Sequence, residues 1–151
     1  MSYSSFQELK VVITAAQLLT LHTAPVLLVP GQAGCVIEIE SLYYRYFHGS
    51  VQFNPATADQ IAVVFGSTSS SSNPNVNPEL AKGFVDQAVD MSCWASPSWG
   101  LNGVIKAFPL ATYKGQGLSL MQYGATFPTG ANWAQGNGQL AVFLKYAYIE
   151  V

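Results

Sequence analysis

The side chains that most often carry acid–base chemistry or bind metals are scarce in this chain and widely spaced. The 151 residues include two histidines, His22 and His48, and neither has a second ligand-type residue two or four positions further on. A catalytic or zinc site needs several such groups close together. We therefore predict structural roles: His22 closes a short helix, where a cation is favoured, and His48 lies beside Gly49 at the end of a strand.

Carboxylates form two pairs whose spacing would place both members on one face of their element. Glu38 and Glu40 would share a strand face, and Asp86 and Asp90 would share a helix face. Either pair could bind a cation or lie at a subunit contact, and a solvated face is the alternative. Since calcium takes six or more oxygen ligands and none lies nearby in the sequence, we predict no metal site.

Motifs for nucleophiles and phosphates are missing as well. The serine-rich stretch 67–72 lacks the GxSxG pattern, and the glycine pair "GQAG" at 31–34 leads into "CVIEIE", a strand pattern, where a phosphate loop would lead into a helix. Cys35 and Cys93 form no CxxC pair and are expected to be buried free thiols. We predict that the chain is not an enzyme and has no catalytic residue and no cofactor.

Charge is unusually low for a chain of this length. Charged residues make up 9% of the sequence and apolar ones 50%, against about 25% charged in an average soluble domain. With a net charge of −2 and no basic stripe, nucleic-acid binding is not expected, and no apolar run approaches the roughly 20 residues that span a membrane. The N-terminus lacks a signal-peptide pattern, so we expect synthesis in a cytoplasm.

The elements that would position these residues are mostly strands. Short runs rich in Val, Ile, Leu, Tyr and Phe alternate with Gly, Pro, Asn and Ser clusters, which predicts an all-β, single-domain antiparallel β-sandwich or jelly roll. One short helix is expected at Thr14–Leu21, where Thr14 and Gln17 have capping-box spacing. The predicted strands are Glu8–Ile13, Val26–Val29, Cys35–Phe47, Val51–Phe53, Ile61–Phe65, Val104–Leu110, Leu118–Gln122 and Gln139–Val151.

A loop and a segment without a single assignment follow the fifth predicted strand. Residues 66–78 have a composition typical of an exposed loop. Pro78–Asp90 fits either a short helix or an irregular loop, because Gly83 weakens its helical pattern. We assign residues 1–7 to an N-terminal arm and residues 8–151 to one domain.

The alternation within Cys35–Phe47 predicts a β-bulge. Ile37 and Ile39 would share one face, but beyond Ser41 the apolar side chains fall on the opposite face, at Leu42, Tyr44 and Tyr46. One extra residue near Ser41 would return all of them to one side.

The last predicted strand is apolar on both faces. Leu140, Val142, Leu144, Tyr146 and Tyr148 form one face, and the other carries Ala141, Phe143, Lys145, Ala147, Ile149 and Val151. A solvated antiparallel strand would have a polar row there. The second face would therefore pack on a like subunit, or on another layer of the same chain.

The three tryptophans fall in turn-like stretches that also carry Asn and Gln. Trp94 and Trp99 lie in "SCWASPSWG", and Trp133 lies in "TGANWAQGNG". A loop tryptophan can plug one end of a sandwich, anchor a protein interface or stack on a sugar. All three uses remain open at this point.

Two blocks resemble a known class of protein. The opening "LKVVITAAQLLTLHTAPVLLVPGQAGCVIEIESLYYRY" and the closing "GNGQLAVFLKYAYIEV", together about a third of the chain, resemble small structural proteins of tailed bacteriophages. The nearest kind is the capsid decoration or cement protein, typically a trimer on a shell of major capsid protein. Similar blocks also appear in tail-associated proteins.

The resemblance implies a jelly-roll virion protein on the outer capsid surface, made in the host cytoplasm, with a homo-oligomer and the major capsid protein as its partners. From its charge and its short apolar runs, the chain is expected to have no nucleic acid and no membrane as partners. The alternative is a receptor-binding module of a tail fibre or spike that recognises host glycan. The arm would anchor through Tyr3 and Phe6. The full set of candidate interface residues is Tyr3, Phe6, Trp94, Trp99, Trp133, Phe143 and Ile149.

Overall fold

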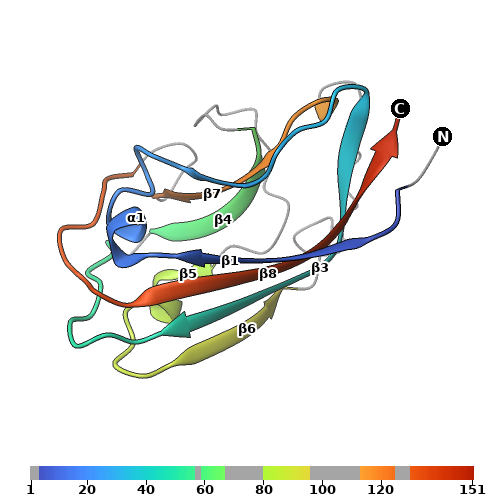
Figure 1. Ribbon diagram of the computed structural model, residues 1–151. Coiled ribbons are helices and arrows are strands. Elements are labelled where there is room, and N and C mark those ends of the chain that lie inside the picture. The colour runs from blue at the N-terminus through green and yellow to red at the C-terminus, as the bar shows by residue number, and fades with distance from the viewer. Residues whose placement is uncertain (1–3, 57–58, 67–79, 96–112, 125–129) are drawn as a thin grey trace.

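A computed structural model describes residues 4–56, 59–66, 80–95, 113–124 and 130–151. Their strands form two antiparallel sheets that pack face to face (Figure 1). The strands are β1 (Gln7–Ile13), β2 (Val26–Val29), β3 (Cys35–Phe47), β4 (Gln60–Phe65), β5 (Leu80–Ala81), β6 (Met91–Ala95), β7 (Leu118–Tyr123) and β8 (Gln139–Glu150). The predicted all-β sandwich with one short N-terminal helix is confirmed.

The chain crosses between the sheets at almost every step. Sheet A has the order β1-β8-β3-β6, and sheet B has the order β2-β7-β4-β5. Strands that follow each other in sequence therefore lie in different sheets, except for β4 and β5. The two long strands β3 and β8 pair along their whole length and form the centre of sheet A.

Most strand boundaries agree with the predicted ones to within one residue, with three exceptions. Residues 51–53 form no strand, so that prediction was wrong; Phe53 is buried there as a loop residue. The short strands β5 and β6 were missed because each sits in a stretch that reads as loop. The predicted strand Val104–Leu110 and most of the loop 66–78 lie outside the described residues.

The segment predicted as either helix or loop is neither a helix nor wholly irregular. After β5 it contains one 3-10 turn, η1 (Lys82–Phe84), and then bends until β6 begins. Phe84 and Val85 point into the core and are buried.

The short helix α1 (Ala15–Leu19) begins as predicted. The backbone N–H of Gln17 donates to Thr14 Oγ1 at 3.3 Å, and the N–H of Thr14 donates to Gln17 Oε1 at 2.9 Å. This capping box satisfies two N–H groups that the helix itself leaves without partners. The helix is shorter than predicted, and a turn carries the chain from Thr20 through His22 to β2.

The predicted bulge in β3 is confirmed. Ile39 pairs with Tyr146 and Ser41 pairs with Lys145, so Glu40 is the extra residue between two consecutive partners on β8. Because the extra residue swaps the faces, Ile37 and Ile39 point into the sandwich on one side of the bulge and Leu42 does so on the other.

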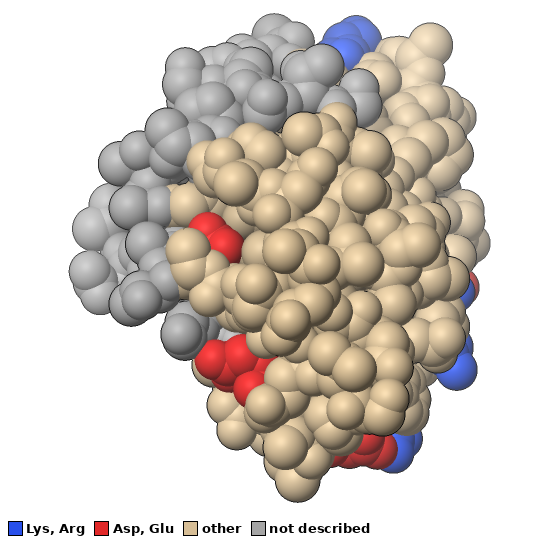
Figure 2. Space-filling model, turned by 90° about the vertical axis from the view of Figure 1, so that its left-hand side faces the viewer, with Lys and Arg blue, Asp and Glu red and all other residues tan. Residues whose placement is uncertain are grey.

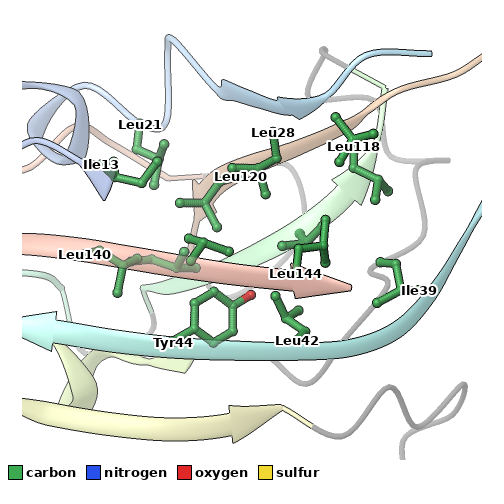
Figure 3. Packing of buried hydrophobic residues seen from close by; sticks show 14 of the residues in the cluster. Ile13, Leu21, Leu28, Ile39, Leu42, Tyr44, Leu118, Leu120, Leu140 and Leu144 are labelled. Carbon is green, nitrogen blue, oxygen red and sulfur yellow. The ribbon is translucent and has the colours of Figure 1, made fainter. Parts of the chain in front are cut away.

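The core lies between the two sheets (Figure 3). Leucines and isoleucines from both sheets and from the helical connection converge there, with Tyr44 fully buried among them. The labelled core residues are Ile13, Leu21, Leu28, Ile39, Leu42, Tyr44, Leu118, Leu120, Leu140 and Leu144.

The "GQAG" segment is a corner, as predicted. Gly34 has a φ of 81°, which favours glycine, and it leads directly into β3. A Cβ on Gly31 would lie 2.0 Å from the carbonyl oxygen of Gly115, so the backbones of the two turns touch.

Candidate interaction surface

The outward face of sheet B is closed over β4 and β7, whereas Leu27 on the edge strand β2 is 55% exposed. Ala62 and Val64 on β4 and Met121 and Tyr123 on β7 point away from the main core, yet they are between 0% and 3% exposed and form a second buried cluster. This face therefore offers no surface to another molecule at these positions.

The outward face of sheet A is open. Alternation along β1, and its register with β8 and β3, place one set of side chains away from the core. Phe6 is 43% exposed and Val12 is 44% exposed. We call this set the sheet A surface: Phe6, Glu8, Lys10, Val12, Tyr43, Arg45, Phe143 and Lys145.

The prediction that β8 is covered on both faces holds only in part. Ala141 and Ala147 are fully buried on the outward side, whereas Phe143 and Lys145 between them are half-buried. Ala141 is paired with Val12 on one side and Arg45 on the other, so longer neighbours in the same sheet shield its small side chain. The cover comes from neighbouring strands and is incomplete.

Two aromatic rings stand side by side in the middle of this surface. Tyr43 and Phe143 are direct cross-strand partners, and their ring centroids lie 5.4 Å apart at a tilt of 49°. The Lys10 ammonium lies 5.4 Å from the centre of the Phe143 ring. The rings form part of a groove of about 550 Å³, lined by Glu8, Leu9, Lys10, Ser41, Tyr43, Phe143, Leu144 and Lys145.

The cations of the sheet A surface lie beside phenylalanine rings, and one of them also forms an ion pair. Lys145 Nζ lies 2.6 Å from Glu40 Oε2 and 5.7 Å from the centre of the Phe6 ring. The hydrogen bond to Glu40, and then the charge of Glu40, raise the pKa of Lys145 above its usual value. Arg45 lies 4.8 Å from the centre of the Phe47 ring. Such cation–π contacts keep a cation close to an apolar surface.

The predicted interface residues lie in different parts of the molecule. Phe6 and Phe143 belong to the sheet A surface, and Ile149 is half-buried near the end of β8. Trp94 was expected in a turn but lies in β6, where it is the register partner of Tyr43. Tyr3 and Trp99 lie outside the described residues.

The predicted arm, residues 1–7, is partly tied to the domain. Strand β1 begins at Gln7, one residue inside the arm, and the side-chain oxygen of Ser4 accepts from the N–H of Tyr148 at 2.9 Å. The N–H of Ser4 donates to the carbonyl of Tyr148 at 3.0 Å.

Trp133 is a core residue and not an interface residue, which corrects that assignment. It is 6% exposed, its ring centroid lies 5.4 Å from that of Phe53, and its Nε1 donates to Asp59 Oδ2 at 2.9 Å. Asp59 also accepts from the N–H of Ala56 at 2.7 Å. Of its three possible roles, Trp133 therefore has that of a plug at one end of the sandwich. Its indole N–H is satisfied by a hydrogen bond within the chain.

The amides that accompany Trp133 also serve the chain itself. Asn54 Oδ1 accepts from the N–H groups of Ala134 and Gln135, both at 3.1 Å. Asn137 Oδ1 accepts from the N–H of Val51 at 2.8 Å. These bonds fix the loop before β8 to the loop after β3, so these amides are not positioned for a sugar.

The end of the sandwich where β3 finishes carries acidic patches on a largely uncharged surface, with basic groups toward the rim of this view (Figure 2). There the N–H of His48 donates to Asp90 Oδ1 at 2.8 Å. Tyr46 Oη and His48 Nδ1 are buried without a hydrogen-bond partner. Burial, and then the charges of Asp86 and Asp90, raise the pKa of Tyr46, so its phenol stays protonated at neutral pH.

The other chemistry-bearing residues have structural surroundings. His22 Nδ1 lies 3.0 Å from the carbonyl oxygen of Gln122, and Cys35 and Cys93 are half-buried rather than buried. Within the described ranges, no group of three or more His, Cys, Asp or Glu residues is placed to hold a metal ion. The same ranges contain no helix with the length and apolarity to cross a membrane.

Sequence reasoning found Phe6 and Phe143 but missed the other members of the sheet A surface: Glu8, Lys10, Val12, Tyr43, Arg45 and Lys145. Their grouping depends on which strands are neighbours and in which register, and a single sequence does not contain that information. Comparison with family models, with curated proteins and with solved structures gives no match.

Proposed function

We propose that this protein is a structural component of a tailed-phage particle, a capsid decoration protein that binds the major capsid shell from outside and stabilises it. The main support for this proposal is the contrast between the outward faces of sheet A and sheet B. Sheet B is buried on the outward side of β4 and β7, whereas sheet A presents the exposed Phe6 and Val12 and the half-buried rings of Tyr43 and Phe143, with charged residues among them. An exposed apolar patch bordered by polar residues is typical of an interaction site.

Strand order supports the accompanying proposal that the sandwich is a jelly roll. A jelly roll contains eight strands in two sheets built from two Greek keys. The described strands number eight, and sheets of order β1-β8-β3-β6 and β2-β7-β4-β5 alternate along the chain. The resemblance of the two terminal blocks to phage structural proteins points to the same fold.

A decoration protein stabilises its shell by mass action, because it binds the assembled form and not the separated subunits. The sheet A surface suits that role. Its rings lose water only when a partner covers them, and its charges already have ring or carboxylate neighbours, so burial leaves few of them without a partner. We also retain a homo-oligomer, a trimer by the resemblance, as part of this proposal.

Co-sedimentation with shells assembled from the major capsid protein of its own particle tests the proposal. We expect saturable binding at hundreds of copies per shell and a higher shell melting temperature. Phe143→Ser should weaken the binding strongly, because it removes a ring from the centre of the surface. Val89→Ser is the matched control, since Val89 is 58% exposed but lies outside sheet A. No binding, or equal loss in both variants, would count against the proposal.

One observation favours a second function, recognition of host glycan by a tail module. The groove of about 550 Å³ combines two rings with Glu8, Lys10, Ser41 and Lys145, which can donate to and accept from sugar hydroxyls. With Glu40 included, the two carboxylates and two ammonium groups sum to zero, which suits a neutral sugar. Binding to purified host surface polysaccharide that is lost in Tyr43→Ser, with no binding to shells, would favour this function.

A further inference from the structure

Strand β1 is an unpaired edge of sheet A. It pairs with β8 on one side, and no other described strand pairs with it. Its core-facing side chains are incompletely covered as a result. Leu9 and Val11 are half-buried, whereas their partners on β8, Leu144 and Val142, are 3% and 1% exposed. The edge therefore has both open main-chain groups and unfinished apolar packing, which favour the addition of another strand.

The residues of this edge are self-complementary in an antiparallel arrangement. Suppose that two copies of β1 pair antiparallel with Leu9 on the two-fold axis. Residue i of one copy then faces residue 18 − i of the other copy. Glu8 then faces Lys10 of the second copy, and Lys10 faces its Glu8. Phe6 faces Val12 in the same row, and both are exposed in the single chain. In the core-facing row, Leu9 meets its own copy.

We propose that a second copy of this chain docks on β1 by antiparallel strand addition centred on Leu9, which joins sheet A of the two copies into one continuous sheet. This pairing satisfies the open main-chain groups and covers the half-buried Leu9. It also creates two identical charge pairs, because a two-fold interface repeats each contact. The proposal does not depend on the protein being part of a particle.

Charged residues on an edge strand often prevent pairing with another strand. The signs of the charges on β1 show whether they would prevent or favour pairing with a second copy. If the charges on the edge all had the same sign, two copies of the strand would repel each other in any register. Here the signs of Glu8 and Lys10 are opposite and flank the proposed centre symmetrically, so self-pairing in this register brings unlike charges together.

Charge reversal tests the pairing through the mass of the protein in solution, measured by sedimentation equilibrium. The variant E8K would place Lys against Lys10, and K10E would place Glu8 against Glu, each twice per interface. We expect each variant alone to self-associate at least about tenfold more weakly than the original chain. An equimolar mixture of the two should form a mixed dimer, since every contact then joins opposite charges. E150K, an exposed change on β8 away from this edge, is the control.

A cross-linking experiment keeps the proposal testable if a charge variant folds poorly. In a background with Cys35→Ser and Cys93→Ser, Leu9→Cys should form a disulfide-linked dimer on mild oxidation, because residue 9 faces its own copy. Val11→Cys should not, since it faces Gln7. A monomer at all concentrations, an oligomer unaffected by either charge variant, or equal cross-linking at both positions would overturn the pairing. None of these measurements uses shells, so their failure leaves the proposed binding to the capsid shell standing.

Discussion

The two sheets of the sandwich differ most on the sides that face away from each other. On sheet B, β4 and β7 are buried on both faces, including Val64 and Met121 on the outward side. On sheet A, the outward side carries the exposed Phe6 and Val12, the half-buried rings of Tyr43 and Phe143, and charged residues. The inner faces, by contrast, are equally apolar. The outward side of the sandwich is therefore closed over β4 and β7 of sheet B and open on sheet A.

This asymmetry shows which apolar patterns point to a partner. Strand β4 reads as an apolar run after Gln60, and β7 combines apolar residues with the buried Ser119 and Gln122; both strands are buried on both faces within the chain. Strand β8 has an equally apolar outward row, but small alanines alternate there with half-buried Phe143 and Lys145. An apolar row alone does not separate these cases. Charges that occur beside rings, as Lys145 does beside Phe6, mark the open one.

Deletion of Glu40 is expected to have the largest effect on this asymmetry. Without the extra residue, the two halves of β3 would present opposite faces to the core, and either Ile37 and Ile39 or Leu42, Tyr44 and Tyr46 would turn outward. Since each lost apolar side chain costs about 2–4 kcal/mol, we expect the chain not to fold. Circular dichroism and thermal unfolding would show this directly.

Glu40→Ala is the control for the deletion, because it removes the ion pair with Lys145 and keeps the residue count. That pair is exposed, with 38% and 44% of the two side chains accessible, so its loss should change stability little. A folded deletion variant would mean that the bulge does not set the faces of β3.

The next largest effect is expected from a valine-to-lysine substitution, which should lower stability much more on the outward face of sheet B than on that of sheet A. Val64→Lys places an ammonium group where the parent side chain is 1% exposed, and we expect it to lower the free energy of unfolding by about 4 kcal/mol or more. Val12→Lys, at a site that is 44% exposed, should change it by no more than about 0.5 kcal/mol. Urea unfolding at low protein concentration measures both. Equal effects would show that the two outward faces are equally covered.

Local features of the fold were predictable because the chain encodes them over a few residues. The capping box needs only Thr14 and Gln17, and the bulge at Glu40 follows from the alternation of side chains on one strand. The strand β6 was missed because its short sequence sits among Ser, Pro and Trp. The burial of Trp133 depends on Asp59 and Phe53, more than seventy positions earlier in the chain, so its role was open.

The candidate surface was harder to predict for the same reason. Phe143 was found from the alternation of β8 alone, but Lys10 and Tyr43 join it only through the order β1-β8-β3. Alternation tells which side of a strand a residue lies on, and it does not tell which strand is the neighbour. Charge scarcity predicted that some surface is covered, yet it could not say that sheet A rather than sheet B is the open one.

The smallest expected effect concerns the inner side of sheet A, at Tyr46. Its hydroxyl is buried without a partner, so Tyr46→Phe should leave stability at pH 7 unchanged or raise it by about 1 kcal/mol. The pKa of Tyr46 is raised above its ordinary value of 10.0, first by burial and then by Asp86 and Asp90. As the pH rises above 10, the unfolded chain loses this proton before the folded one does, so the original chain loses stability that the variant keeps.

Unfolding by urea between pH 8 and pH 11 measures this difference. The variant should gain on the original chain only above about pH 10. Tyr148, whose pKa is also raised by burial, is present in both chains and cancels. Parallel curves over the whole range would mean that water reaches the Tyr46 hydroxyl, and that the end of sheet A near Asp90 is as open as its outward face.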